Sequence, residues 1–267
     1  MPFAQLEDIK LYYEIHGQGF PLVCIAGITA DHMVWASVIE PLAQKYQVIV
    51  FDNRGVGQSD VPPGPYSIAQ MSEDAYKLCQ YLKIKEAIVM GSSMGGYITQ
   101  ELMRRYPQWV RAGILVDSTQ CSRSSFNLFF EGQLELMQAQ APLNSRVKLT
   151  LSLVYSSGFL SIPGRVDQLI ELRANYPYAA TEAGMRAQFA ALQEFNSSDW
   201  VHELHIPCLV IGGAEDLIFD EASIKALAQA LPQAQYHSFA KAGHLPHQEM
   251  PQEFVQVVNK FIQSVMH

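Results

Sequence analysis

Several features that mark other classes of protein are missing from this sequence. No apolar stretch among its 267 residues approaches the ~20 residues that cross a bilayer. Residues 1–8 are acidic and contain neither the basic nor the apolar region of a signal peptide. The 18 basic and 26 acidic residues are scattered rather than grouped, and the formal net charge is −8. We therefore expect neither a membrane nor a nucleic-acid partner.

Motifs for metals and dinucleotides are missing as well. No His-x-x-x-His pair with a partner acid occurs, and no Gly-x-Gly-x-x-Gly follows an apolar run. Cysteine is scarce, and its four positions are far apart without a Cys-x-x-Cys pair: Cys24, Cys79, Cys121 and Cys208. These absences predict a reduced, cytoplasmic protein that needs no metal and no other cofactor.

Short apolar runs alternate with helical patterns along most of the chain. Six runs are too short for helices, and most of them are β-branched and apolar on both faces, as in strands buried inside a parallel sheet: residues 21–26, 47–51, 86–90, 112–116, 207–211 and 235–239. A looser alternation over residues 9–16 suggests early strands. Apolar residues spaced by three and four, or stops at proline, predict helices over residues 67–82, 97–106, 221–231 and 252–265. The order predicts an α/β fold with a mostly parallel central sheet flanked by helices.

One region breaks this alternation. Residues 120–206 contain helical patterns and no convincing strand, and glycine and proline interrupt them repeatedly. We interpret them as an inserted set of short helices, a helical cap. The α/β core is then built from residues 1–119 and 207–267, and the sequence does not indicate an oligomeric state.

A small-residue segment, Met-Gly-Ser-Ser-Met-Gly-Gly-Tyr, follows the third of the short apolar runs. It places Ser93 at the centre of a Gly-x-Ser-x-Gly motif, with a predicted strand before it and a predicted helix after it. A flexible turn without chemistry is the alternative interpretation. The context favours a strained strand-to-helix turn that fits only glycine two residues before and after Ser93. Such a turn exposes the serine hydroxyl as a nucleophile.

A serine nucleophile needs a base, and the base needs an acid. Among eight histidines we select His244, in the loop between the last predicted strand and the last predicted helix. His247 lies close to it and is interpreted as a neighbour or an exposed loop residue. The acid is Asp216, which follows the strand at 207–211, and Asp117 is its rival because it ends the strand at 112–116.

The other six histidines carry no motif, and we interpret them as surface or packing residues: His16, His32, His202, His205, His237 and His267.

Acyl transfer also needs two donors for the oxyanion that forms on the substrate. The backbone N–H of Met94, directly after the nucleophile, is one candidate. The other is the N–H of Ile28, in the loop after the first core strand, where Gly27 lets the chain turn. These two groups are the predicted oxyanion hole.

The order of these motifs resembles that of the α/β-hydrolases over nearly the whole chain. Residues 52–59, Asp-Asn-Arg-Gly-Val-Gly-Gln-Ser, are similar to a turn of the branch that holds small esterases, enol-lactonases and C–C hydrolases. The resemblance implies structural roles for Asp52 and Arg54. The family often has His-Gly at the oxyanion loop, where this chain has Ala26 and Gly27.

The nucleophile narrows the chemistry that this resemblance implies. Haloalkane dehalogenases and epoxide hydrolases of the fold carry aspartate at the position of Ser93. The Ser-Met-Gly-Gly-Tyr segment is similar to the elbow of 3-oxoadipate enol-lactonases and of many carboxylesterases. We therefore expect hydrolysis of a small carboxylic ester or lactone, with thioesters also open.

Three alternatives remain. A cofactor-free perhydrolase of the bromoperoxidase type and a C–C bond hydrolase would use the same triad. A non-catalytic binding protein on the same fold has no need of Ser93, Asp216 and His244 together.

The cap holds five of the nine arginines and many aromatic residues. The ordinary explanation is that cap helices pack on the core through apolar faces, which contain the aromatic residues, and expose charged faces, which contain the arginines, to water. The functional alternative is an apolar pocket in which Arg123 holds a substrate carboxylate, because this residue follows the strand that ends at Asp117.

Overall fold

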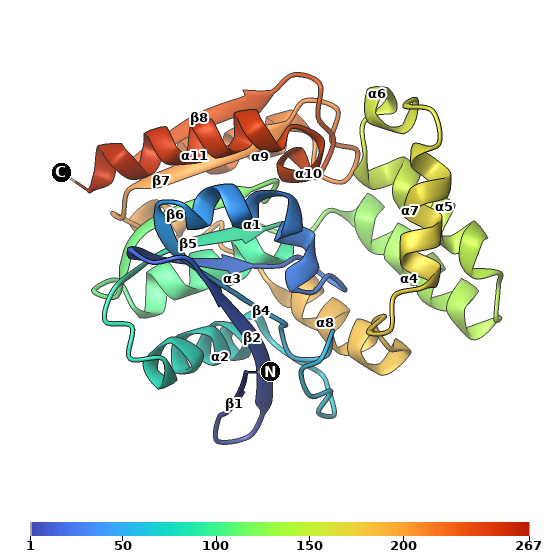
Figure 1. Cartoon of the computed structure of the whole chain (residues 1–267), viewed down its shortest axis with the longest axis horizontal. Helices are drawn as coiled ribbons and strands as arrows, with labels where there is room; N and C mark the ends of the chain where they lie inside the picture. The colour runs from blue at the N-terminus through green and yellow to red at the C-terminus, as the bar shows by residue number, and fades with distance from the viewer. Residues whose placement is uncertain (1, 267) are drawn as a thin grey trace.

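The computed structural model describes residues 2–266, and its centre is one twisted, eight-stranded sheet (Figure 1). In space the strands run β1-β2-β4-β3-β5-β6-β7-β8. The strand β2 is antiparallel to β1 and β4, and every other neighbouring pair is parallel. The bounds are β1 Phe3–Gln5, β2 Lys10–His16, β3 Phe20–Ile25, β4 Tyr46–Phe51, β5 Ala87–Ser92, β6 Val110–Val116, β7 Cys208–Gly213 and β8 Ala234–Phe239.

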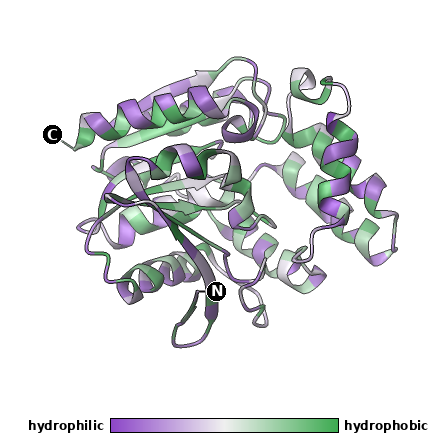
Figure 2. Cartoon of the chain, in the orientation of Figure 1, coloured by the Kyte–Doolittle hydropathy of each residue, from purple (hydrophilic) through white to green (hydrophobic). Residues whose placement is uncertain are grey.

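Helices cover both faces of this sheet. The helices α1 (Ala36–Ala43) and α11 (Pro251–Val265) pack on one face, and α2 (Ile68–Tyr81), α3 (Met94–Arg105) and α9 (Glu221–Ala230) pack on the other. Successive strand residues therefore serve different cores: in β3, Leu22 and Cys24 join the first, and Val23 and Ile25 the second. Figure 2 shows both colours on the same helices, as expected for helices with one apolar face.

The predicted α/β architecture is confirmed. Every predicted core strand is present, with bounds shifted by at most two residues, and so are the four predicted helices. The sequence analysis did not assign β1, the 3₁₀ helix η1 (His32–Trp35), α1 or the one-turn α10 (Pro246–Glu249). Proline explains part of this: Pro41 lies inside α1, where a missing N–H normally argues against a helix.

Between β6 and β7 the chain forms helices, without a named strand in the described residues. They are α4 (Ser124–Gln138), α5 (Leu143–Val154), α6 (Ser157–Leu160), α7 (Arg165–Ala174), α8 (Glu182–Glu194) and the 3₁₀ helix η2 (Val201–Glu203). We call residues 124–194 the α4–α8 segment. In Figure 1, α4 to α7 stand beside the sheet, and α8 lies nearer to it.

The parts of this segment differ in burial. The helix α8 buries six of its residues, whereas α6 and α7 bury none. The segment is thus attached firmly to the core at its C-terminal helix. Within residues 2–266, no helix combines the length and the hydropathy that a membrane crossing requires.

Candidate active site

The loops after the parallel strands meet at one edge of the sheet, because the carboxyl ends of these strands all point there. Ile28 follows β3, Ser93 follows β5 and Asp117 follows β6. Asp216 follows β7, and His244 follows β8. The topology therefore gathers residues that are up to 216 positions apart in the sequence onto one side of the molecule.

Ser93 stands at a strained turn between β5 and α3. Its backbone angles are φ 56° and ψ −119°, outside the regions that an L-residue ordinarily adopts. The flanking glycines are required sterically: a Cβ at Gly91 would overlap the Gly95 carbonyl, and one at Gly95 would overlap the Ile25 carbonyl. The Ser93 N–H is tied to Val116 O at 2.8 Å. The strain and the crowding together match the elbow that the motif predicts.

His244 and Asp216 form a buried pair. The Nδ1 atom of His244 lies 2.7 Å from Oδ2 of Asp216. The other carboxylate oxygen accepts the backbone N–H groups of Ile218 at 2.7 Å and Phe219 at 3.2 Å. Because Asp216 can only accept at Nδ1, the imidazole keeps its proton there and leaves the Nε2 lone pair free. The His244 backbone N–H is itself fixed, by Val154 O of α5 at 2.8 Å.

The hydroxyl of Ser93 and Nε2 of His244 are not hydrogen-bonded to each other in the described structure. Neither atom has a hydrogen-bond partner among residues 2–266. Catalytic hydrogen bonds are often long before a substrate is bound, so the arrangement is compatible with a serine–histidine pair. What the structure joins directly is the histidine and its acid.

Asp117, the rival acid, has other partners. Its Oδ1 accepts the Gly213 N–H at 2.7 Å, and its Oδ2 is buried without a partner among the described residues. Burial, and after it the charge of Asp216, raises the pKa of Asp117 well above its ordinary range. Of the two acids, Asp216 is the one whose carboxylate lies within hydrogen-bond distance of the His244 ring.

The two candidate oxyanion donors are unoccupied backbone groups. Within residues 2–266 no acceptor takes the N–H of Ile28 or of Met94. Met94 opens α3, where the first N–H groups of a helix have no partner and favour negative charge. Gly27 lies beside the nucleophile, since a Cβ there would be 3.1 Å from Ser93 Cβ and 3.7 Å from its Oγ.

Arg123 is not in contact with this group of residues in the described structure. Its guanidinium pairs with Asp220 at 2.6 Å, and 38% of its side chain is exposed. Asp220 caps the N-terminus of α9, four residues after Asp216. Any anion that binds the Arg123 guanidinium would have to share it with Asp220.

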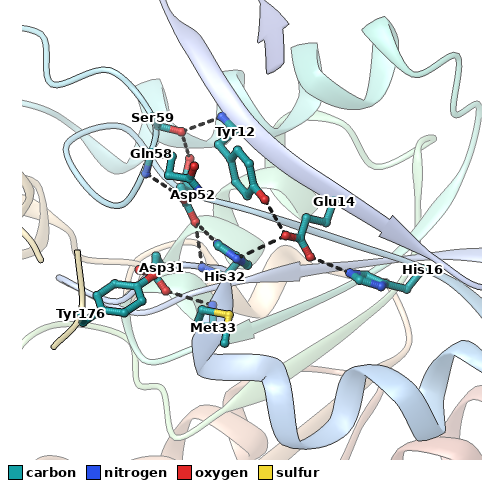
Figure 3. A network of polar contacts seen from close by, with 10 residues as sticks. All are labelled: Tyr12, Glu14, His16, Asp31, His32, Met33, Asp52, Gln58, Ser59 and Tyr176. Atoms are coloured by element: carbon teal, nitrogen blue, oxygen red, sulfur yellow. Dashed lines mark hydrogen bonds and ion pairs between the residues drawn. The ribbon is translucent and has the colours of Figure 1, made fainter. Parts of the chain in front are cut away.

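A second buried histidine is the main feature that sequence reasoning missed (Figure 3). His32 was interpreted as a surface or packing residue, but its Nδ1 lies 2.6 Å from Asp52 Oδ1 and its Nε2 3.6 Å from Glu14 Oε1. Burial lowers its pKa, but the hydrogen bond and the charge of Asp52, with the charges of Asp31 and Glu14, raise it more, and the net shift is upward. In the sequence, the feature that could have pointed to this pair is the turn at residues 52–59, which begins with Asp52.

His247 is buried rather than an exposed loop residue. Its ring lies 4.5 Å from the Trp35 ring, and neither of its nitrogens has a hydrogen-bond partner in the described residues. Burial, with a smaller contribution from the charge of His244, lowers the pKa of His247 to about 3. A ring held neutral among aromatic residues acts in packing.

Two side-chain groups have the donor types of a metal site: Asp31, His32 and Asp52, and Asp117, Asp216 and His244. In the first, Asp52 already accepts the His32 ring and the backbone N–H groups of His32 and Gln58. In the second, Asp216 accepts His244 and two backbone N–H groups. The oxygens of Asp52 and Asp216 that could bind a metal ion thus already accept hydrogen bonds from N–H groups. We therefore interpret both groups as hydrogen-bond networks.

Comparison with known proteins identifies the family of the chain. Residues 21–251 match the family described as alpha/beta hydrolase fold. The chain is 31% identical to the "Putative non-heme bromoperoxidase BpoC" of Mycobacterium tuberculosis over 96% of its length and 99% of that protein's. It is 27% identical to 3-oxoadipate enol-lactonase 2 of Acinetobacter baylyi, with 97% and 94% covered. A thermophilic esterase of Thermogutta terrifontis superposes with a TM-score of 0.85 at 27% identity, with 96% and 94% covered.

Proposed function

The chain belongs to the α/β-hydrolase family, and we propose that it is a serine hydrolase that cleaves a small carboxylic ester or lactone through an acyl-enzyme. The observation that carries this proposal is the buried His244–Asp216 pair at the same sheet edge as the strained Ser93 turn. The likeness to an esterase and an enol-lactonase supports the choice of ester and lactone substrates.

The proposed reaction has two halves. The Ser93 hydroxyl attacks the carbonyl carbon while Nε2 of His244 takes its proton, and Asp216 stabilises the resulting imidazolium. The carbonyl oxygen becomes an oxyanion that accepts hydrogen bonds from the backbone N–H groups of Ile28 and Met94. His244 then donates the proton to the departing alkoxide, which leaves an acyl-Ser93. In the second half, water attacks the acyl carbon while His244 takes its proton. The bond to the Ser93 oxygen then breaks, His244 returns the proton to that oxygen, and the acid is released.

The α4–α8 segment acts in this proposal as the cap, within the insertion at residues 120–206. It contributes the apolar side chains Phe126, Phe130 and Phe189, which are buried in the same core cluster as Phe219, a neighbour of His244. The cytoplasm is the proposed location, since all four cysteines are free.

Replacing the nucleophile tests the proposed function. In Ser93→Ala, turnover of p-nitrophenyl esters should fall by about 10⁴-fold or more, because an activated serine is removed and only binding and the oxyanion donors remain. Purified protein is assayed with esters of graded chain length, an enol-lactone and an aryl carbamate. Circular dichroism controls for the fold, and a folded variant with near-wild-type turnover refutes the assignment.

A perhydrolase is the second candidate, favoured by the likeness to the bromoperoxidase-type protein. In that reaction hydrogen peroxide replaces water in attacking the acyl-enzyme. Peracid formation from acetate and peroxide is measured beside ester hydrolysis with the same protein. A ratio strongly in favour of peracid would assign the perhydrolase, and loss of both activities in Ser93→Ala would place them on one triad. A C–C hydrolase would instead cleave a 1,3-diketone, and a binding protein would show none of these activities.

The role of Arg123 is a separate prediction. If its guanidinium holds a substrate carboxylate, Arg123→Ala should raise KM for a carboxylate-bearing lactone by about tenfold, roughly the loss of one charge-assisted pair. Neutral short esters should be unaffected. Asp220→Ala is the matched control, because it removes the partner and leaves the guanidinium free. Equal effects of Arg123→Ala on charged and neutral substrates contradict a specific role.

A further inference from the structure

We infer that Gln188, on α8, is a positioning residue for the oxyanion hole: its side chain holds the turn that presents the Ile28 N–H. The inference rests on the proposed function, and it links the α4–α8 segment to the chemistry rather than only to substrate access.

Gln188 is a fully buried amide with both ends in use. Its Oε1 accepts the Thr29 N–H at 2.8 Å, and its Nε2 donates to the Arg54 carbonyl at 2.8 Å. Only this orientation of the amide offers an acceptor to the N–H and a donor to the carbonyl. A buried amide is tolerated when its hydrogen bonds are made, so the side chain is held firmly between two loops of the core.

One of these loops is the oxyanion turn. The Ala30 N–H bonds to Gly27 O at 3.3 Å and closes a four-residue turn with Ile28 and Thr29 at its centre. Thr29 has φ +60°, which is unfavourable for a β-branched residue and persists only where the surroundings impose it. The Gln188 bond fixes the peptide between Ile28 and Thr29, and thereby the plane in which the neighbouring Ile28 N–H points.

The support behind Gln188 is rigid. The helix α8 touches the core backbone to backbone, because a Cβ at Gly184 would overlap the Gly55 carbonyl. One residue before Gln188, the Ala187 carbonyl accepts the Tyr66 N–H at 3.3 Å. A side chain based on such a helix can hold a loop with the accuracy that an oxyanion donor requires.

The chain offers a matched control in Gln100, on α3. It is also fully buried, donates from Nε2 to Thr119 O at 2.9 Å and accepts the Ser197 hydroxyl at 2.7 Å. It therefore has the burial and the bonding of Gln188 without a contact to the oxyanion turn. Gln188→Met and Gln100→Met remove the same groups at nearly constant volume.

The two methionine variants are compared in ester hydrolysis and in inhibition by phenylboronic acid, which forms a tetrahedral adduct with an activated serine. Gln188→Met should lower kcat by about 10- to 100-fold, a part of the ~10²–10³-fold loss on deleting an oxyanion donor, and leave KM nearly unchanged. The inhibition constant of phenylboronic acid should rise in parallel with the loss in kcat/KM. Gln100→Met should lower the thermal midpoint comparably and keep kcat.

A second variant keeps the test decisive if the methionine variant does not fold. In Gln188→Glu, the neutral carboxylic acid can make both hydrogen bonds, whereas the carboxylate cannot donate to Arg54 O. Its turnover should therefore be near wild type at mildly acid pH and fall behind wild type as the pH rises. If Gln188 had a purely structural role, its variants would change the melting temperature without lowering kcat selectively and without this dependence of turnover on pH.

The possible outcomes distinguish failure of the positioning role of Gln188 from failure of the proposed hydrolase function. Wild-type kcat in Gln188→Met, or equal kcat losses in both methionine variants, overturns the role of Gln188 and leaves the serine hydrolase intact. A wild-type protein that neither turns over esters through Ser93 nor binds phenylboronic acid overturns the proposed function and the inference together.

Discussion

Two buried histidine–aspartate pairs lie in this molecule, and they are nearly identical at Nδ1. The His244–Asp216 distance is 2.7 Å and the His32–Asp52 distance is 2.6 Å, and all four residues are buried. In both pairs the aspartate also accepts backbone N–H groups. The pair alone therefore does not identify a catalytic base.

The difference lies at the other ring nitrogen. Nε2 of His32 faces Glu14 at 3.6 Å, and Asp31 adds a further negative charge, so its surroundings raise the pKa of the ring and favour its protonated form. Nε2 of His244 has no hydrogen bond or ion pair with a described acid. A ring nitrogen that faces a carboxylate is a poorer acceptor for a serine proton than one without such a partner. The comparison teaches that the free nitrogen, more than the bonded one, distinguishes a base from a structural cation.

The largest expected difference in kcat is between variants in which one or the other of these two histidines is replaced. His244→Ala should lower kcat by about 10⁴-fold or more, while His32→Gln should change it by less than about tenfold. The reason is that, of these two rings, it is His244 whose Nε2 has no partner among the described residues. Steady-state hydrolysis of a p-nitrophenyl ester measures both variants, with thermal melts as the control for folding. A comparable kcat loss in folded His32→Gln would break the comparison.

Exchanging the acids should give the next largest effect. Asp216→Asn should lower kcat by about 10³- to 10⁴-fold, because the amide favours the wrong tautomer and cannot stabilise the imidazolium. Asp117→Asn should lose much less, since Asp117 has no hydrogen bond to His244 in the described structure and the rise in its pKa favours the uncharged carboxyl. The reverse order of losses would move the acid from β7 to β6 and sink the assignment of Asp216.

The smallest effect concerns stability and pH. The pKa of His32 is raised on folding, so its stabilisation is complete below ~6.5, the usual value for an unfolded chain, and is lost as the pH rises through the folded-state value. His32→Gln should therefore destabilise the protein by about 1–3 kcal/mol at pH 6, as for a hydrogen bond to a charged group, and by less at higher pH. Urea titrations at several pH values measure the difference, and a pH-independent gap contradicts a cationic His32.

The fold was largely predictable because the core strands are apolar on both faces. Residues 87–90 form an apolar run typical of a buried strand, and the glycines around Ser93 allow a crowded turn that larger residues would block. Asp216 and Asp117 could not be separated by sequence alone. Both end core strands, and the choice depends on which carboxylate reaches Nδ1 of His244, which is a matter of a few ångströms.

The contacts that sequence could not indicate are those between distant segments. Thr29 and Gln188 are 159 positions apart, and no periodicity predicts that an amide on α8 will meet that N–H. The pairing of Arg123 with Asp220 is of the same kind, since each residue alone resembles an ordinary surface charge. His32, interpreted from the sequence as a surface or packing residue, is buried at the centre of a polar network, and a single sequence carries no direct record of burial.

The contact between Gly55 and Gly184 constrains how such a protein can diversify. A side chain at Gly184 would overlap the Gly55 carbonyl, so a mutation there should push α8 outward and draw Gln188 away from the Thr29 N–H. A side chain at Gly55 would meet the Tyr66 ring and would also be strained by the positive φ of that residue. Helices α6 and α7, which bury no residue, are free of that restriction. Over generations, substitutions should therefore accumulate more readily in α6 and α7 than at the two glycines.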